Sequence, residues 1–364
     1  MSGTSWTTAA LGELVSCESP SADADATRRC GELLAGLVVT HLDGGPPERV
    51  EVGGRTHLSW TWGDPRVLVL GHVDTVWPMG TLARWPFLLD GDVATGPGVF
   101  DMKAGLVQAL LALSLLDRLD GVRLLVTADE ELGSPTSADL VRDSARGLAA
   151  TFVCEPSAAG ALKTARKGIA LYDVTVTGRA AHAGLEPEKG ANAGLALAHA
   201  LVAIAELGRA DRGTTVTPTV LAAGTTTNTV PAAASAALDV RAAVPAELDR
   251  VERDLRALVA AEPVVPGTRL ELGGGVNRPP LDAASSADLF AIARQLAPAA
   301  GVADLRGVAV GGGSDGNFTA GIGVPTLDGL GAVGDGAHAE GEHVLLSHVE
   351  PRARLLASLI EEVR

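Results

Sequence analysis

Three acidic residues stand side by side in the stretch TADEELGS: Asp129, Glu130 and Glu131 follow the apolar run at residues 122–126. Neighbouring carboxylates repel one another, and burying even one is costly unless positive charge compensates it. A solvated loop would explain these acids without further chemistry. A bound cation would explain them as well, and the other acids and histidines of the sequence decide between the two interpretations.

Potential metal ligands follow three successive predicted strands, at residues 67–71, 122–128 and 148–154. They are His72 and Asp74 after the first strand, Asp129, Glu130 and Glu131 after the second, and Glu155 after the third. In open α/β sheets, ligands bind beyond the carboxyl ends of the strands. Any one of these acids alone would more often be solvated or cap a helix.

Two further candidates lie in loops: Asp101 in the glycine-rich turn GPGVFDMKAG, and His338 in GAHAEG. A lone histidine is more often a surface or core residue than a ligand. Two histidines and three carboxylates together, however, form a ligand set for one or two Zn²⁺ ions. The cations would also offset the repulsion among the carboxylates, so the joint pattern favours a metal site.

The spacing within these motifs assigns different tasks to neighbouring residues. In extended chain, residues two apart face the same way, so Asp74 can orient the His72 ring. Glu130 and Glu131 are adjacent and should point differently. One of them can then bind metal, while the other stays free to act as a general base.

The order of predicted elements indicates an α/β protein with two domains, which its 364 residues also favour. Strands and helices alternate from residue 67, which predicts a mixed, largely parallel sheet with helices on both faces. A β-α-β-β-α-β order follows over residues 167–276, typical of a ferredoxin-like domain. We therefore expect this domain to be inserted into a catalytic domain made of residues 1–166 and 277–364, with hinges near 165–168 and 275–278.

Composition excludes several classes of function. The net charge of −15 argues against binding to nucleic acid or to an anionic membrane. The three cysteines form no CxxC pair, so neither a zinc ribbon nor a disulfide framework is indicated. The N-terminus lacks the pattern of a signal peptide and no apolar run is long enough for a membrane span. We expect a cytoplasmic protein.

The motifs also resemble those of a known family. GHVDTVWPMGT, GPGVFDMKAG, TADEELGSPTS, VCEP, KTARKG, GRAAHAGLEPEKGANA, NTVPAAA, DVR, GGGSDG and GAHAEG occur in the order found in the M20 metallopeptidases. Among these, the chain is similar to glutamate carboxypeptidases of the carboxypeptidase G2 type. The resemblance implies a zinc-peptidase-like catalytic domain and makes the inserted domain a lid that also forms a homodimer.

The resemblance further implies two zinc ions per subunit, bridged by Asp101. One ion would also bind His72 and Glu155, and the other Glu131 and His338. Glu130 would be the general base, and Asp74 would support His72. The peptide bond after Asp101 would be cis. Co²⁺ and Mn²⁺ suit the same ligands.

The resemblance assigns the substrate contacts to other motifs. His182 in GRAAHAG would reach across the dimer and stabilise the tetrahedral oxyanion, although alone it would be interpreted as a turn histidine. The residues that would hold the substrate carboxylate are Asn228, Arg241 and Arg278. Lys163 is a candidate for a side-chain carboxylate, and the backbone at Gly313 and Ser314 for the carboxylate end, because GGGSDG lacks a phosphate-loop pattern.

These expectations describe a zinc-dependent hydrolase. It would cleave the amide bond of an N-acyl amino acid or a dipeptide with a free C-terminal carboxylate, and release glutamate. An aminoacylase or deacetylase of the acetylornithine or succinyl-diaminopimelate type would share the same ligands. A catalytically inactive, amino-acid-binding relative would be expected to lack a ligand, Glu130 or His182, and all are present. The acyl group is not determined by these motifs.

Overall fold

The computed structural model describes residues 3–42 and 44–364, which form two compact units. Unit 1 contains the described residues up to Arg166 together with Leu281–Val310 and Ser314–Arg364. Unit 2 contains Lys167–Pro280 and Gly311–Gly313. Residues 277–280 and 311–313, which were expected in the catalytic domain, thus lie in unit 2. The last strand of unit 2 continues through Arg278, and this carries the chain past the expected boundary.

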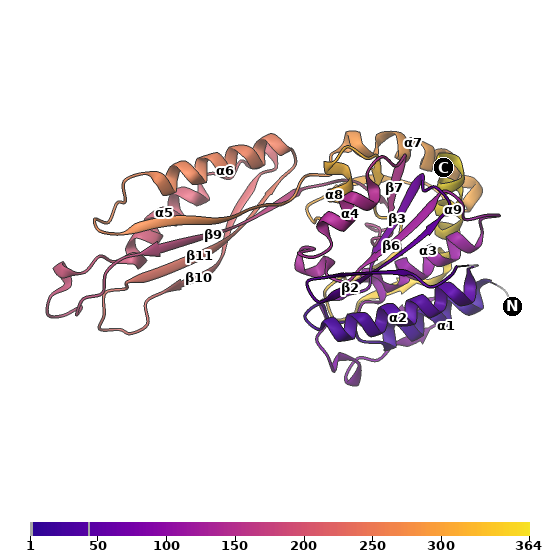
Figure 1. Cartoon of the computed structure of the whole chain (residues 1–364), viewed down its shortest axis with the longest axis horizontal. Coiled ribbons are helices and arrows are strands. Elements are labelled where there is room, and N and C mark those ends of the chain that lie inside the picture. Colours follow the sequence, from indigo (N-terminus) through magenta and orange to yellow (C-terminus); the bar gives the residue numbers. More distant parts are fainter. Residues whose placement is uncertain (1–2, 43) are drawn as a thin grey trace. The chain divides into compact units, whose positions relative to one another are not determined.

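A six-stranded mixed sheet forms the centre of unit 1 (Figure 1). Its strands, in spatial order, are β1 (Glu48–Val52), β2 (Arg55–Trp62), β6 (Val122–Thr127), β3 (Val67–His72), β7 (Ala150–Val153) and β14 (Thr326–Leu327). The run from β6 to β14 is parallel, and β1 and β2 are antiparallel additions at one edge. The predicted mixed, largely parallel sheet is confirmed.

Helices cover both faces of this sheet (Figure 1). One face carries α1 (Gly3–Ser16), α2 (Ala24–His41), α3 (Ala104–Ser114), α7 (Ala283–Ala300) and α9 (Val349–Val363), and the other carries α4 (Ala138–Ala145) and α8 (Gly316–Gly321). Val67 and Val69 of β3 pack toward the first group, whereas Leu68 and Leu70 pack toward the second. This alternation is the period of two that a strand buried on both faces requires. Of the helices that the structure describes, none combines the length and apolar character needed to cross a membrane.

Short elements outside the main sheet carry several site loops. One small sheet contains β4 (Leu88–Asp90), β5 (Val93–Thr95), β15 (Gly334–Asp335) and β16 (His343–Leu345), and a second pairs β8 (Leu162–Arg166) with β13 (Gly307–Val310). The short helical turns are η1 (Thr81–Ala83), η2 (Val99–Lys103), η3 (Glu130–Leu132), η4 (Pro187–Lys189), η5 (Ala210–Arg212) and η6 (Leu346–His348). The Asp101–Met102 peptide bond inside η2 is cis, as the resemblance implies.

Unit 2 has the predicted β-α-β-β-α-β order. Its antiparallel sheet contains, in spatial order, β10 (Thr215–Ala223), β11 (Ala233–Ala242), β9 (Gly168–Thr177) and β12 (Arg269–Arg278). Alternate residues of β9, from Ala170 to Val176, pack with α5 (Ala193–Ala205) and α6 (Pro245–Ala260) in one core. This is the ferredoxin-like plan expected from the sequence.

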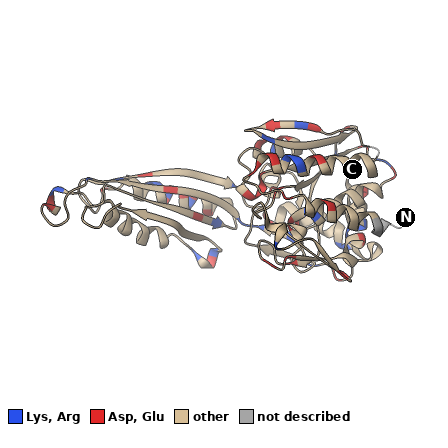
Figure 2. Ribbon diagram, turned by 90° about the horizontal axis from the view of Figure 1, so that it is seen from below, with Lys and Arg blue, Asp and Glu red and all other residues tan. Residues whose placement is uncertain are grey.

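The two helices of unit 2 present different outer surfaces. Acidic and basic residues are mixed along α6, where Arg250 pairs with Glu247 and Asp254, whereas α5 contains no charged residue (Figure 2). On α5, Leu195 and Val202 are 56% and 66% exposed. The outer face of α6 is therefore that of a solvated helix, and the outer face of α5 is apolar.

Candidate metal centre

Three parallel strands deliver candidate ligands to one edge of the main sheet. His72 is the last residue of β3 and pairs with Thr127, the last residue of β6. Glu130 and Glu131 follow β6, and Glu155 follows β7 on the other side of β3. The carboxyl ends of neighbouring parallel strands meet at one edge of the sheet, so these side chains converge. In the sequence, all three glutamates lie more than fifty positions after His72.

Asp101 lies between the two histidines. Its Oδ1 is 3.2 Å from Nε2 of His72, and its Oδ2 is 3.6 Å from Nε2 of His338. Glu155 Oε1 lies 3.5 Å from His72 Nε2, and Glu131 Oε2 lies 3.1 Å from His338 Nε2. The five residues thus form two groups, each with one histidine and one glutamate, that share Asp101.

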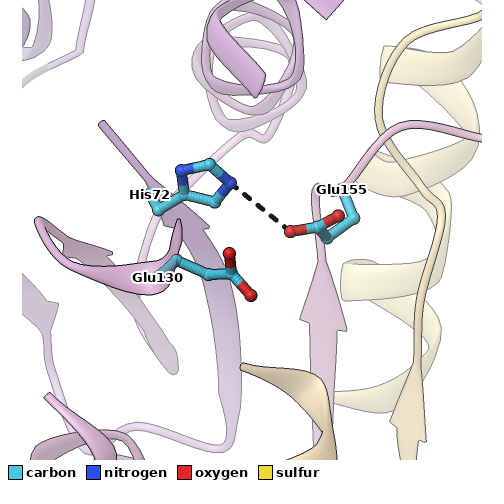
Figure 3. Close-up of side chains that lie close together, drawn as sticks. All are labelled: His72, Glu130 and Glu155. Atoms are coloured by element: carbon cyan, nitrogen blue, oxygen red, sulfur yellow. Dashed lines mark ion pairs between the residues drawn. The ribbon is translucent and has the colours of Figure 1, made fainter. Parts of the chain in front are cut away.

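Glu130 lies beside the first group. Figure 3 shows its carboxylate and that of Glu155 facing the same space next to the His72 ring. One ligand atom from each of His72, Glu130 and Glu155 lies within 4.8 Å of the others, and the same holds for His72, Asp101 and Glu131. Glu130 is therefore close enough to act on a molecule held by the other carboxylates.

The carboxylates stabilise the protonated, positively charged forms of the two histidines. Hydrogen bonds that the His338 ring donates to Asp101 and Glu131 raise the pKa of His338 to about 10. Burial disfavours the imidazolium of His72, but contacts with Asp101, Asp74 and Glu155 outweigh it and raise the pKa of His72 well above its ordinary value. A divalent cation bound here would supply the same charge while leaving both imidazoles neutral, as ligands must be. The imidazole and carboxylate donors suit Zn²⁺, and Co²⁺ and Mn²⁺ as well.

Asp74 supports this cluster in a way that spacing alone did not indicate. Its backbone carbonyl lies 2.9 Å from Nδ1 of His72, whereas its carboxylate Oδ1 is 3.5 Å away. The carboxylate accepts hydrogen bonds from the backbone N–H groups of Glu130 and Glu131, both at 3.2 Å, and from the Ser21 hydroxyl at 2.7 Å. Asp74 therefore joins the loop after β3 to the loop that carries the two glutamates.

Asp129, the first of the three adjacent acids, is fully buried and belongs to neither group of potential ligands. Its carboxylate accepts hydrogen bonds from the Thr136 backbone and hydroxyl and from the Ser137 hydroxyl, at 2.5–2.7 Å. Buried His57 extends this network: its Nδ1 accepts the Ala128 N–H, so its Nε2–H donates to Thr136. The three acids thus have separate environments, and Asp129 shapes the loop.

A buried arginine contacts Glu155, and a buried aspartate pairs with that arginine. The sequence had indicated neither residue. Arg166 donates to both carboxylate oxygens of Asp328 at 2.8 Å and reaches Glu155 Oε2 at 3.2 Å. Lys163 Nζ lies 3.9 Å from the same Glu155 oxygen, and burial lowers its pKa. The motif KTARKG contains both cations, but only the fold reveals that Arg166 is buried against Asp328.

The GGGSDG loop contributes buried contacts at its Ser314–Asp315 end. The hydroxyl of Ser314 donates to Asp328 at 2.5 Å, and Asp315 accepts hydrogen bonds from the hydroxyls of Thr127 and Ser134. Ser314 is fully buried, and its hydroxyl is held by Asp328, so its side chain supports the loop. Asp315 was not singled out from the sequence, although it anchors the loop of Glu130.

The predicted substrate residues of unit 2 fall into two places. Arg241 of β11 and Arg278 of β12 both pair with Ile169 of β9, so they flank it on one rung of the sheet. Arg241 holds Asp239 through two hydrogen bonds, at 2.9 and 3.0 Å, and donates to the Gly311 carbonyl at 3.2 Å. A Cβ at Gly313 would lie 2.7 Å from Ile169, which places this glycine beside the rung.

His182 and Asn228 lie beyond the other end of β9, on adjacent segments joined through Thr229 and Ala183. Nδ1 of His182 accepts the N–H groups of Gly184 and Leu185, both at 3.1 Å. The ring proton therefore stays on Nε2, where the exposed imidazole can donate it. From Ile169 to Thr177 the strand spans about 26 Å at about 3.3 Å per residue, so one small molecule cannot contact both places within unit 2.

A mixed α/β unit with histidines and carboxylates converging at its strand ends is typical of a metal-dependent enzyme. The chain matches the family described as Peptidase family M20/M25/M40 over residues 68–362, and it belongs to this family. The family is metal-dependent, and the protein is accordingly an M20-type metallopeptidase or amidohydrolase.

Individual relatives agree with this assignment. Carboxypeptidase G2 of Pseudomonas sp. (strain RS-16) is 30% identical over 315 residues, which cover 83% of this chain and 74% of that protein. Aminopeptidase PepT from Bacillus cereus ATCC 10987 has a similar structure, with a TM-score of 0.79 at 22% identity, over 99% of this chain and 98% of the other. YXEP of Bacillus subtilis, titled a dinuclear metal binding peptidase from the M20 family, has a TM-score of 0.67 at 14% identity, over 99% and 98%. These two structures support the fold.

Proposed function

We propose that this protein is a two-zinc hydrolase that cleaves the amide bond of an N-acyl amino acid or dipeptide with a free C-terminal carboxylate, and releases glutamate. The observation that carries the proposal is the position of Asp101 between two histidine–glutamate pairs, with Glu130 beside them. The description of the Bacillus subtilis relative as dinuclear supports two ions.

In this proposal His72, Glu155 and Asp101 would hold one ion, and Glu131, His338 and Asp101 would hold the other. Bound divalent cations would polarise the scissile carbonyl and make water more acidic. Glu130 takes the proton from the attacking water and transfers it to the departing amine nitrogen as the C–N bond breaks. The Asp74 carboxylate keeps Glu130 in place by accepting a hydrogen bond from the backbone N–H of Glu130.

The substrate carboxylate is assigned to the part of the unit 2 sheet where Arg241 and Arg278 flank Ile169. Arg241 and Arg278 come from different strands but flank the same residue, so the two arginine side chains start from neighbouring positions of the sheet. Planar guanidinium groups bind carboxylates through paired hydrogen bonds. Asp239 accepts hydrogen bonds from Nε and Nη2 of Arg241, and the Gly311 carbonyl accepts one from Nη1, so a substrate carboxylate would use the second N–H groups of Nη1 and Nη2. Lys163 is proposed for a side-chain carboxylate, and the name of the Pseudomonas relative, a carboxypeptidase, is consistent with a free C-terminus.

A homodimer through unit 2 completes the proposal. His182 lies too far along β9 to share a small substrate with Arg241 of the same unit, which supports a role for His182 of the partner subunit at the oxyanion. Leu195 and Val202 on α5, and Val220 and Leu221 on the edge strand β10, are exposed apolar residues that a partner could cover. The cytoplasmic location stays a prediction from the sequence.

A substrate panel tests the assignment. Release of the amino acid is measured for an N-acyl-glutamate, N-acetyl-ornithine and N-acetyl-methionine, with zinc present and then with a chelator. Cleavage confined to the glutamate substrate and abolished by the chelator is the expected result. Cleavage of N-acetyl-ornithine or N-acetyl-methionine instead would move the protein to the aminoacylase or deacetylase branch, and metal binding without any cleavage would favour the inactive amino-acid-binding alternative.

The variant Glu130→Gln tests the general base. We expect kcat to fall by roughly 10²- to 10⁴-fold, the usual contribution of a general base, while the bound metal content stays at the wild-type value. Both are measured on the same preparation, by rate assay and elemental analysis. Loss of a metal ion would instead make Glu130 a ligand, which its closeness to His72 and Glu155 would explain.

A further inference from the structure

A single buried carboxylate holds the loop that carries Asp101. Glu342 is fully buried, and its Oε1 accepts the backbone N–H groups of Phe100 at 2.8 Å and Asp101 at 2.9 Å. Its Oε2 accepts the N–H of Gly98 at 3.0 Å and the indole N–H of Trp77 at 2.8 Å. Four donors from segments about 240 residues or more away thus meet one side chain.

The geometry of the loop explains why it needs such an acceptor. Gly98 has a φ of +73°, and a Cβ there would lie 2.5 Å from the Thr75 methyl group, so the chain turns tightly beside the β3 loop. Asp101 and Met102 are also non-helical, although they lie within a helical turn. Buried N–H groups that no regular element pairs must find another partner. Glu342 provides it for three of them.

The segment that carries Glu342 also carries a candidate ligand. His338 precedes Glu342 by four residues, in the turn between β15 and β16. Its ring faces Asp101 and Glu131. One short segment therefore contacts the Asp101 loop twice. The His338 ring contacts the side chain of Asp101, and the Glu342 carboxylate accepts hydrogen bonds from the backbone of the loop.

We infer that Glu342 is a positioning residue: it fixes the backbone of Asp101 so that the two carboxylate oxygens face the two histidines, and it joins this loop to Trp77. The inference rests on the proposed function, because it assumes that Asp101 bridges two metal ions. Only a carboxylate can serve all four donors, since the amide of glutamine has one acceptor oxygen and presents N–H groups where Oε1 or Oε2 accepts.

Cobalt binding to the full chain tests this inference without a substrate. Apoprotein of the wild type, Glu342→Gln, Trp77→Phe and Glu340→Gln is titrated with Co²⁺, and the visible absorption of the bound metal gives both affinity and ligand geometry. We expect Glu342→Gln to bind Co²⁺ roughly 10- to 100-fold more weakly and with an altered spectrum, as for other residues that orient metal ligands. Trp77→Phe, which removes one of four hydrogen bonds, should show a smaller change in the same direction.

Glu340→Gln is the matched control. Glu340 is two residues away, its side chain is 74% exposed, and it pairs only loosely with Arg84, at 3.6 Å. This variant should keep the wild-type affinity and spectrum. For Glu342→Gln on a cleaved substrate, kcat should fall while KM stays within a few-fold, because Glu342 contacts no substrate in this scheme.

The outcomes separate the inference from the proposed function. A folded Glu342→Gln protein, checked by circular dichroism, with wild-type Co²⁺ affinity and spectrum would overturn the inference. If that variant does not fold, Trp77→Phe decides, and an unchanged affinity and spectrum in Trp77→Phe would overturn it. Wild-type protein that binds two cobalt ions but cleaves no member of the panel would contradict the proposed function and leave the inference intact.

Discussion

The candidate residues of the two units are held in very different ways. In unit 1, His72 and Glu155 are buried, and each contacts at least two charged neighbours. In unit 2, the side chains of His182 and Asn228 are exposed and accept hydrogen bonds from residues one to three positions away. Burying charge is costly unless it is paired, so the unit 1 cluster must be built with its supporting network. Exposed groups need no such network and can adapt to a ligand.

The largest effect on stability should come from breaking that network in unit 1. Asp328→Asn removes the carboxylate that pairs with buried Arg166 through two hydrogen bonds. We expect the free energy of unfolding to fall by about 3–5 kcal/mol, the usual cost of removing one partner of a buried ion pair. Denaturant unfolding measures it, and metal affinity should fall as well, because Arg166 also holds Glu155.

The control for this change is Asp288→Asn, the same substitution at an exposed position on α7. It should change the unfolding free energy by less than about 0.5 kcal/mol, as surface substitutions usually do. If the two variants were equally stable, the contrast between a tightly held unit 1 cluster and an adaptable unit 2 surface would be lost.

A smaller effect, on binding alone, is expected in unit 2. Arg241→Lys keeps the positive charge but loses the planar fork that the proposal uses for the substrate carboxylate. KM for the cleaved substrate should rise roughly 10- to 100-fold, the worth of a hydrogen bond to a charged group, with kcat changed much less. Steady-state kinetics on the substrate found in the panel provides the measurement.

Arg269→Lys, at an exposed position on β12 paired with Glu271, is the matched control and should leave KM unchanged. An unchanged KM in Arg241→Lys as well would leave Arg241 as a strand residue that only pairs with Asp239.

The smallest effect is the dependence of unit 2 stability on acid. Hydrogen bonds from Arg250 and Thr214 hold the pKa of Glu247 at about 2, below its ordinary value of 4.5. Because the folded pKa is lowered, the stabilisation is fully present above pH 4.5 and is lost as the pH falls toward 2. Hydrogen exchange of β9 to β11, followed by mass spectrometry, should show faster opening over this range.

In Glu247→Gln this acid-dependent component should disappear, whereas Asp249→Asn, in the same helix, should keep it. An identical pH dependence in wild type and Glu247→Gln would show that other groups control the acid response of unit 2.

The sequence predicted those parts of the fold that depend on local pattern. The strands β3, β6 and β7 and the order of elements in unit 2 follow from apolar periodicity, and the structure agrees. The small sheet of β4, β5, β15 and β16 was not predicted, since its strands are two or three residues long and show no period. That sheet brings Glu342 to the Asp101 loop, which explains why Glu342 was missed.

By itself, the sequence determined the chemical kinds of the site residues and their places at strand ends, because ligand types and strand periodicity are local properties. Only the tertiary structure decided which residues meet. Asp101 faces both histidines, Arg166 is buried against Asp328, and Arg241 and Arg278 share one rung. These contacts join residues from 29 to 237 positions apart in the chain. They arise from sheet pairing and from the need to compensate buried charge, which no local pattern records.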